Sequence, residues 1–150
     1  MTLQVVVDTN LIVSAFLWGG SPGKLIGELL TRGIPMLTTQ AMIDELDATL
    51  RKPKFDSRFQ AKGVTPDELM DEYRQMTQLV TPAEIPDDSV RDPKDQIILA
   101  AAVGGSASHL ISGDKDLTTL RQYSDVMVLT VSQFLAMMNQ STETPSDKPH

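Results

Sequence analysis

The sequence contains no cysteine and no long hydrophobic run. The absence of cysteine excludes disulfides, thiolate metal ligands and a cysteine nucleophile, and it is typical of a reducing compartment such as the cytoplasm. No segment approaches the roughly 18 consecutive apolar residues of a membrane-spanning helix, and no basic or apolar leader precedes the first predicted strand. We therefore expect a cytoplasmic protein that neither enters nor crosses a membrane.

Basic residues are fewer than acidic residues, and the formal net charge is −7. That balance argues against general electrostatic attraction to nucleic acid, although acids gathered around a divalent cation are neutralised once the ion binds. One stretch of the chain has the opposite charge, because residues 51–62 (RKPKFDSRFQAK) carry five basic residues and one acid. A length of 150 residues and a hydrophobic fraction of 41% favour one globular domain.

Short apolar runs alternate with helix signals along the chain. The predicted strands cover residues 3–7, 34–39, 78–85, 108–112 and 126–130. Helices are predicted between and after them, with the N-terminal caps Asn10, Ser21, Thr39, Thr65 and Asp92. Strands separated by helices predict an α/β fold, a three-layer α/β/α sandwich with a central parallel sheet of about five strands.

The folded domain is predicted to end at residue 138. Residues 139–150 (NQSTETPSDKPH) contain no apolar residue apart from prolines. A segment of this composition cannot add to a hydrophobic core, so a disordered tail is expected there. The domain is therefore assigned to residues 1–138.

Three acidic residues follow predicted strands. Asp8 ends the run LQVVV, and Asp114 and Asp116 follow SHLIS in the segment SGDKD. In a parallel sheet, ligands bind beyond the carboxyl ends of the strands, so these acids should meet at one edge of the sheet. The plainer alternative is that Asp8 makes a turn and that SGDKDL caps a short helix.

Two more acids lie where the helix after residue 92 begins. Asp95 shares the helical spacing of Ile98, Leu99 and Ala102, which places its carboxylate in line with the buried stripe. We expect Asp95 to point inward, and to join the other acids if the helix starts near the strand ends. Asp92 and Asp95 could instead be an N-cap and a first-turn acid with a purely structural role.

A group of converging carboxylates needs a counterion. Carboxylates repel one another, and some would take up protons unless a cation neutralised them. Oxygen ligands without histidine or cysteine suit Mg²⁺ or Mn²⁺. Such an ion acidifies water and offsets the charge that grows on a phosphoryl oxygen, which predicts metal-dependent phosphodiester hydrolysis.

Four segments, taken in order, resemble those of PIN-domain nucleases: VVVDTNLIVSAF, IDELDATLRKPKF, RDPKDQIILAAAV and LISGDKDL. The chain looks most like toxin components of toxin–antitoxin systems, related to VapC-type toxins, over roughly residues 3–138. The resemblance implies a metal-dependent endoribonuclease whose acidic pocket holds one or two Mg²⁺ or Mn²⁺ ions. It also implies an RNA substrate, a cognate antitoxin protein and a homodimer.

The resemblance assigns roles to individual residues of this chain. The implied catalytic residues are Asp8, Glu45, Asp95 and Asp114. The implied metal ligands are Asp8, Asp95, Asp114 and Asp116, with Asp114 or Asp116 left open as the main ligand. The implied supporting residues are Thr9, Asn10 and Asp92.

The basic stretch supplies candidates for binding RNA phosphates: Arg51, Lys52 and Lys54. The same residues are compatible with a solvated helix end, where cations are favourable. The segment around residues 53–66 is longer than in much of the family, so the resemblance is weakest there. Trp18, with the preceding Phe16 and Leu17, is expected to form packing or a dimer surface rather than a base-stacking platform.

Two other functions fit part of the pattern. A haloacid-dehalogenase-type phosphatase would use Asp8 as a covalent nucleophile. In this chain, however, Asn10 replaces the usual second aspartate of that family, no catalytic lysine is clearly placed and Glu45 has no role. A PIN-like domain could also be a non-catalytic binding module, and the retained acids argue against that.

Overall fold

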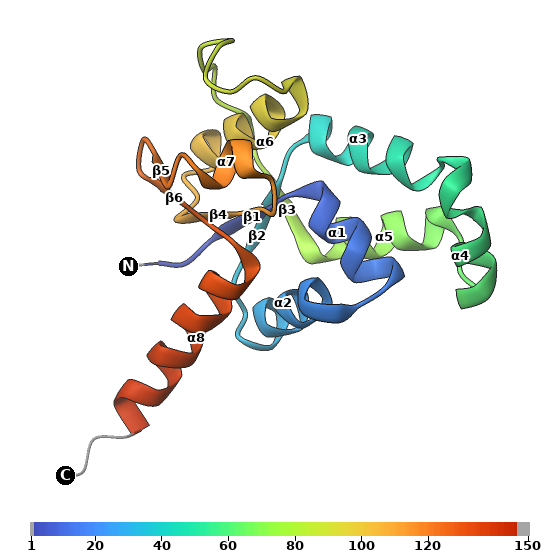
Figure 1. Cartoon of the computed structure of the whole chain (residues 1–150), viewed down its shortest axis with the longest axis horizontal. Coiled ribbons are helices and arrows are strands. Elements are labelled where there is room, and N and C mark those ends of the chain that lie inside the picture. Colours follow the sequence, from blue (N-terminus) through green and yellow to red (C-terminus); the bar gives the residue numbers. More distant parts are fainter. Residues whose placement is uncertain (1, 147–150) are drawn as a thin grey trace.

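The computed structural model describes residues 2–146, the last six of them by their backbone alone. A central sheet has the strand order β3-β2-β1-β4-β6-β5 (Figure 1). Its strands are β1 (Val5–Val7), β2 (Met36–Thr38), β3 (Thr77–Leu79), β4 (His109–Ile111), β5 (Gln122–Tyr123) and β6 (Val126–Leu129). Neighbouring strands are parallel, except that β5 pairs antiparallel with β6. The predicted α/β fold with a parallel sheet is confirmed, with one added antiparallel edge strand.

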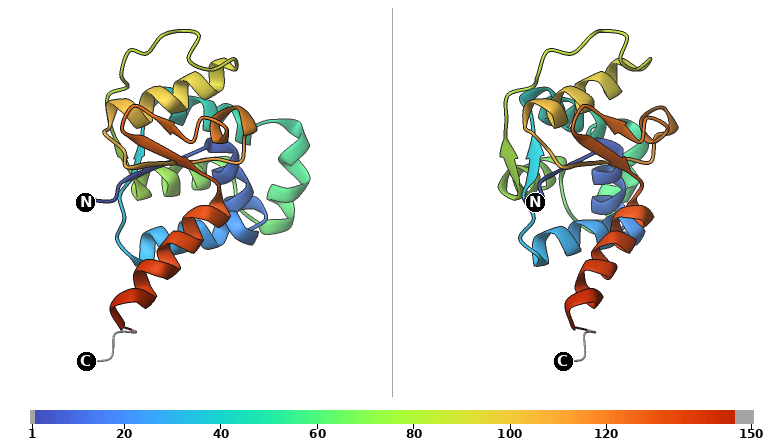
Figure 2. Two further views of the ribbon diagram at one scale, coloured as in Figure 1. Left: turned by 60° about the vertical axis from the view of Figure 1, so that its left-hand side comes forward. Right: turned by 90° about the vertical axis from the view of Figure 1, so that its left-hand side faces the viewer.

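Helices cover both faces of the sheet, as Figure 2 shows. They are α1 (Thr9–Leu17), α2 (Gly20–Thr31), α3 (Gln40–Leu50), the 3₁₀ helix η1 (Pro53–Phe55), α4 (Asp56–Lys62), α5 (Pro66–Met76), α6 (Pro93–Gly104), α7 (Lys115–Thr118) and α8 (Val131–Ser146). Val5 and Val7 pack in a core with α1, α2, α5 and α8, whereas Val6 packs in a second core with α6. This alternation follows from the two-residue period of a strand. It produces the three layers that the sequence predicts.

Several predicted helix boundaries are confirmed by the cap geometry. The Thr39 hydroxyl accepts the N–H of Met42 at 3.3 Å, at the start of α3. Thr65 and Glu68 form a reciprocal capping box at the start of α5. Gly33 follows the end of α2 in the left-handed conformation, with φ 65°.

Two predicted caps are wrong. Asp8, and not Asn10, caps α1, because the chain leaves β1 extended at Asp8 and the Asp8 carboxylate accepts the N–H of Asn10. Helix α2 begins at Gly20, before the predicted cap Ser21, and it has no side-chain cap. Gly19 (φ 79°) and Gly20 (φ 60°) make the tight turn between α1 and α2, a conformation that glycine adopts at little cost.

Some short elements are absent from the prediction. Helices η1 and α4 occupy residues 53–62, where the sequence suggests only a connection after the helix that ends before Pro53. Pro53 instead begins η1, since a proline at the first helical position loses no hydrogen bond. Strand β5 is too short for a periodic pattern to reveal, whereas helix α7 is the short helix that SGDKDL caps in the plainer interpretation of that segment.

The C-terminal helix is longer than predicted. Its backbone is helical as far as Ser146, although a disordered tail is predicted from residue 139. Residues 139–144 include no proline or glycine that would end a helix. The remainder of the predicted tail, residues 147–150, lies outside the described residues. None of the described helices is long and apolar enough to cross a membrane.

The connection between β3 and α6 crosses the end of α6 so closely that Gly104 has no room for a side chain. A Cβ atom on Gly104 would lie 2.1 Å from the carbonyl oxygen of Thr81 and 2.5 Å from the nitrogen of Ala83. The Ala83 N–H also donates to the carbonyl oxygen of Ala100 at 3.0 Å, which fixes the connection against the helix. This contact holds α6 in position, and α6 carries Asp95.

We expect Gly104→Ala to lower the free energy of unfolding by about 2 to 3 kcal/mol, because the obstructing atoms belong to the backbone. The matched control is Gly27→Ala in α2, where an added Cβ meets nothing within 4 Å. That substitution should leave stability unchanged or raise it by up to about 1 kcal/mol. Urea denaturation measures both, and equal stability of the two variants would contradict the close approach.

Candidate metal centre

Asp8 stands where two central strands end side by side. Val7 of β1 is in register with Ile111 of β4, and the Asp8 N–H donates to the Ile111 carbonyl at 2.9 Å. The Asp8 carboxylate accepts the Ser112 hydroxyl at 2.7 Å on one oxygen and the Asn10 N–H at 3.0 Å on the other. Asp8 is 2% exposed, so its orientation is set by the sheet and by these two donors.

Asp114 reaches the same edge through Ser112. The Ser112 hydroxyl donates to Asp8 and accepts the N–H of Asp114 at 2.9 Å, so one buried side chain joins the two acidic segments. Asp114 also caps α7, since its carboxylate accepts the N–H of Asp116 at 2.8 Å. Sequence reasoning missed Ser112. The only signal was a small hydroxyl residue at the end of a predicted strand.

Asp92 and Asp95 are brought to this edge by the start of α6. Asp92 is the N-cap, and its carboxylate accepts the N–H of Lys94 at 2.9 Å. Asp95 is 3% exposed, which confirms that it points inward. Its Oδ2 atom is buried and has no hydrogen-bond partner among the described residues. The helix therefore presents an unpaired carboxylate oxygen to the interior of the site.

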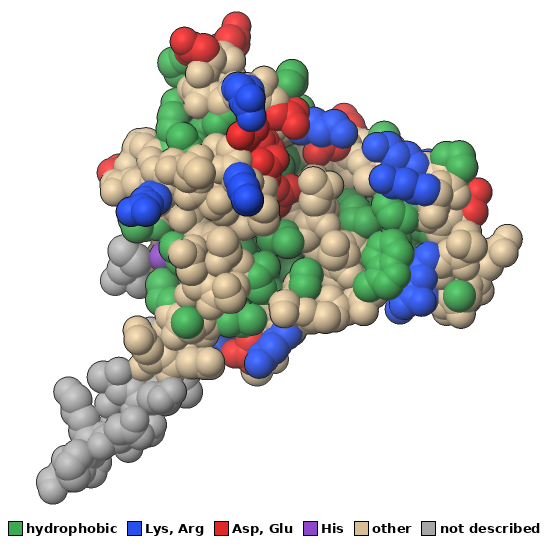
Figure 3. Space-filling model, viewed as in Figure 1, with side chains coloured by type: hydrophobic (Ala, Val, Ile, Leu, Met, Phe, Trp, Pro, Cys, Tyr) green, Lys and Arg blue, Asp and Glu red, His purple; other side chains and the backbone are tan. Residues whose placement is uncertain are grey.

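The carboxylates of three acids lie close enough to share an ion. One ligand atom each from Asp92, Asp95 and Asp114 falls within 4.8 Å of the others. Asp8 is linked to this group by Ser112, and a hollow of about 300 Å³ adjoins it, lined by Asp8, Asn10, Leu11, Ser14, Gly113 and Asp114. Figure 3 shows acidic side chains gathered on this face, near the start of α6. An all-oxygen set of this kind fits Mg²⁺ or Mn²⁺.

The electrostatics of the site disfavour negative charge. Burial raises the pKa of Asp95 to about 7, and the neighbouring Asp114, Asp8 and Asp92 carboxyls add to the increase. Burial also raises the pKa of Asp8, and hydrogen bonds from Ser112 and Asn10 partly oppose that increase. Both shifts identify a place where a cation would be strongly stabilising.

Glu45 approaches the site from α3. The Thr9 hydroxyl donates to Glu45 Oε1 at 2.9 Å, and Thr9 directly follows Asp8 in the chain. This contact ties Thr9, one of the implied supporting residues, to Glu45. Glu45 is not one of the described acids that lie within 4.8 Å of one another, so it stands beside that group.

Some of the other predicted site residues form ion pairs outside the group of three acids. Asp116 accepts two hydrogen bonds from Arg91, at 2.9 and 3.1 Å, so Asp114 is the acid of this pair that joins the carboxylate group. Arg51 forms ion pairs with Asp47 and Asp67. The two remaining basic candidates make no ion pair in the part of the chain that the structure describes: Lys52 and Lys54.

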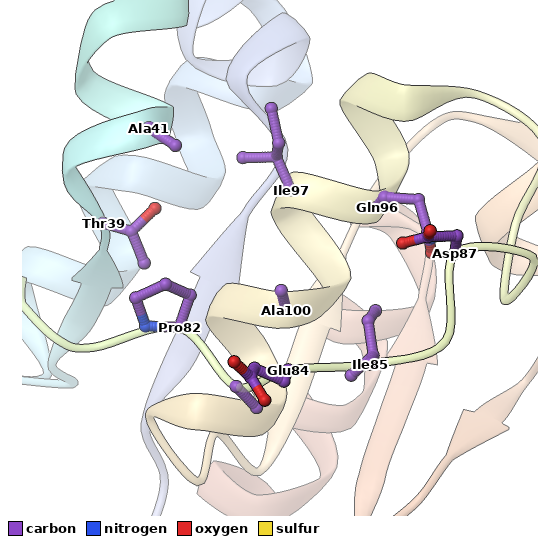
Figure 4. Close-up of a pocket in the computed structure, with 10 residues that line it drawn as sticks. Thr39, Ala41, Pro82, Glu84, Ile85, Asp87, Gln96, Ile97 and Ala100 are labelled. Atoms are coloured by element: carbon purple, nitrogen blue, oxygen red, sulfur yellow. The ribbon is translucent and has the colours of Figure 1, made fainter.

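A larger hollow, of about 510 Å³, lies between α3 and α6 (Figure 4). Thr39, the N-cap of α3, and Ala41 of α3 line one side of it, and Ile97 lines it from α6, above the connection that follows β3. Its two acids, Glu84 and Asp87, belong to no group of described acids that could share an ion. Size alone therefore does not locate the chemistry, and the smaller acidic hollow is the better candidate.

The raised pKa of Asp95 predicts a pH-dependent stability. Because the pKa in the folded state lies above the ordinary value of 3.8, the folded state binds more protons between about pH 4 and 7. The free energy of unfolding of the metal-free protein should therefore fall as the pH rises through that window. In EDTA, Asp95→Asn should raise the free energy of unfolding at pH 7.5 by about 1 to 2 kcal/mol, with a smaller gain at pH 5.

Thermal or urea denaturation at the two pH values measures this effect. Asp44→Asn is the matched control, because Asp44 is an exposed acid of α3 that bonds only Gln40 among the contacts described. It should shift stability by no more than about 0.5 kcal/mol at either pH. If Asp95→Asn is no more stable than wild type at pH 7.5, the ionised Asp95 carboxylate does not destabilise the metal-free fold.

Comparison with known proteins agrees with this geometry. The family model of the PIN domain matches residues 4–116, a segment that begins just before β1 and ends inside α7. A search of curated proteins gave no match. The matched segment contains Asp8, Glu45, Asp95 and Asp114. Because the match covers well over half of the 150 residues, the chain belongs to the PIN-domain family.

Proposed function

We propose that this protein is a metal-dependent endoribonuclease that hydrolyses RNA phosphodiester bonds. PIN domains are generally metal-dependent nucleases, and this chain has an acidic group that could hold an ion. The observation that carries the proposal is the convergence of Asp95 and its unpaired buried oxygen with Asp92 and Asp114, beside Asp8. A bound cation would explain why a carboxylate is buried beside other carboxylates, since burying it without a cation destabilises the fold.

Asp92, Asp95 and Asp114 would together hold one Mg²⁺ or Mn²⁺ ion, and Asp8, which Ser112 joins to the Asp114 segment, would add a ligand to that ion or to a second one. Asp116 is assigned a weaker role because Arg91 already neutralises it. When bound, the ion supplies Lewis acidity, which acidifies nearby water and offsets charge on the phosphate. The protein's own contribution is to fix the carboxylates, and Ser112 does this for both Asp8 and the Asp114 segment.

Glu45 is proposed to accept a proton from the attacking water. Thr9 holds Glu45 Oε1, which leaves Oε2 as the atom available for that proton. Glu45 is only partly buried and lies outside the group of described acids that could share an ion, so a bound metal need not neutralise it. Thr9 acts through Glu45 and is a positioning residue.

A role as the toxin of a toxin–antitoxin pair, a cognate antitoxin, a homodimer and a cytoplasmic location stay predictions of the sequence. Membership of the PIN family replaces the haloacid-dehalogenase alternative, in which Asp8 would be phosphorylated. Both Asp8 oxygens already accept hydrogen bonds, which suits a fixed metal ligand. A non-catalytic PIN-like module is the remaining alternative, and the experiments below distinguish it.

We expect wild-type protein to cleave single-stranded RNA in Mn²⁺ or Mg²⁺ and to lose that activity in EDTA. Asp8→Asn and Asp95→Asn should each reduce the rate by about 100-fold or more, since each removes a ligand and a negative charge. The control Asp44→Asn should cleave at the wild-type rate. Gel analysis of labelled RNA measures cleavage, and phosphate trapped covalently on Asp8 would instead favour a phosphatase.

If all three variants and the wild type fail alike over many RNAs, the non-catalytic module is favoured. Metal binding is then decided separately by melting temperature. Mn²⁺ should stabilise the wild type by RT ln(1 + [Mn²⁺]/Kd) and should have little effect on Asp95→Asn. The two readouts distinguish an inactive metal-binding domain from a domain that binds no metal.

Glu45→Gln should slow cleavage by about 100-fold while the stabilisation by Mn²⁺ is retained, because this change removes a proton acceptor and no ligand. Thr9→Val should have a smaller effect of the same kind. The adjacent Asp44→Asn again serves as the control on α3. Loss of Mn²⁺ stabilisation in Glu45→Gln would place Glu45 among the metal ligands instead.

A further inference from the structure

An exposed tryptophan stands at the far end of α1 from the metal centre. Trp18 is 56% exposed, and its ring meets that of Phe55 edge to face, with centroids 5.9 Å apart. The Arg58 guanidinium lies 5.6 Å from the centre of the Trp18 ring, and the Lys54 ammonium lies 5.1 Å from the centre of the Phe55 ring. These four residues, Trp18, Lys54, Phe55 and Arg58, are called the aromatic-cationic cluster below.

The cluster is anchored to the helix that leads to the metal centre. Lys54 and Phe55 belong to η1 and Arg58 to α4, the two elements that the sequence pattern missed. Arg58 Nε donates to the carbonyl oxygen of Leu17, which ties α4 to the end of α1. Helix α1 has nine residues and rises about 13 Å, so the cluster and Asp8 lie at opposite ends of one short helix.

The cluster concentrates positive charge in an acidic protein. The chain has a net charge of −7, and Asp47 and Asp67 neutralise Arg51. Lys54 and Arg58 make no ion pair with any residue that the structure describes. Figure 3 shows hydrophobic side chains flanked by Lys and Arg over the region of α4, on the same face as the acidic side chains.

Exposed aromatic rings bordered by cations match single-stranded nucleic acid. Unpaired bases stack on aromatic rings while phosphates contact neighbouring cations, whereas a duplex hides the faces of its bases. A contact with a second copy would bury Lys54 and Arg58 and would require acidic partners for them on the other copy. The arrangement therefore fits RNA better than the dimer surface that the sequence suggests for Trp18.

The geometry points to the aromatic-cationic cluster as a platform for single-stranded RNA, on which one base stacks against Trp18 and phosphates contact Lys54 and Arg58. The inference rests on the proposed function, and it adds a binding subsite for the RNA strand and a path for that strand, along α1 to the metal centre. It assigns a specific task to residues 53–62, where the family resemblance is weakest.

Trp18 is the single tryptophan of the chain, so its fluorescence reports on this position alone. In EDTA, where no cleavage is expected, a short single-stranded oligoadenylate should quench the fluorescence saturably. Trp18→Ala should weaken binding of the fluorescein-labelled oligonucleotide by about 5- to 150-fold, measured by anisotropy. Trp18→Phe should keep most of the affinity. Leu79→Ala is the control, because Leu79 is also exposed (64%) but lies on β3.

The cations are tested by charge removal. Lys54→Gln should weaken binding and reduce the slope of log affinity against log salt by about one. Arg121→Gln is the control, since it removes an exposed charge just before β5, away from the cluster. Equal losses in the two variants would mean that only the overall charge of the protein matters, and would overturn the platform.

Other outcomes separate this inference from the proposed function. Labelled RNA that binds or is cleaved normally without any change in Trp18 fluorescence overturns the platform alone. Quenching without cleavage in Mn²⁺ supports the platform and overturns the nuclease. If inorganic polyphosphate quenches Trp18 fluorescence as strongly as the oligoadenylate does, the surface recognises charge only. If Trp18→Ala changes the mass of the protein measured by light scattering but leaves its affinity for RNA unchanged, the surface contacts a second copy of the chain. Both results overturn the platform.

Discussion

The repulsion among carboxylates at one edge of the sheet is the constraint on which the site depends. Asp95 is buried, its Oδ2 atom has no hydrogen-bond partner in the described part of the chain, and its pKa is raised by burial and by the acids around it. A well-packed apolar residue at that position would favour the fold, so the metal-free chain retains a destabilising group. The metal-free fold is therefore less stable than it could be, and a bound cation would restore that stability, because a ligand that binds only the folded state stabilises it.

The same edge offsets part of this repulsion with backbone donors. Asp8, Asp92 and Asp114 are the N-caps of α1, α6 and α7, and each accepts the N–H of the residue two positions later. Helix N-termini carry partial positive charge, which favours carboxylates there. Asp95 lacks this arrangement and is held by the burial of α6. The capping and metal-binding interpretations of these acids are therefore compatible, since the caps fix the orientation that a metal would need.

Local patterns predict the acids, and tertiary contacts decide their partners. Strand periodicity places Asp8 and Asp114 at strand ends, and helical spacing turns Asp95 inward, so each is readable from a short segment. Ser112 is not, because its bond to Asp8 depends on the register of β1 with β4, two strands far apart in the sequence. Pro53 shows a different limit: a proline can end one helix or begin the next, and only the packing of η1 and α4 decides between them.

Helix α1 connects two regions of opposite charge, and this arrangement changes the meaning of the net charge of −7. Acids gather at the N-terminal end of the helix, and the cations of the aromatic-cationic cluster gather near its C-terminal end. A polyanion would be repelled by the first region until a divalent cation binds there, and attracted by the second in either state. For an RNA substrate, productive binding would thus require both regions at once: the cluster to hold the strand and the ion to admit its phosphate. Overall charge is therefore a poor guide to nucleic-acid binding in this chain, because the acids that dominate it include those that a metal would neutralise.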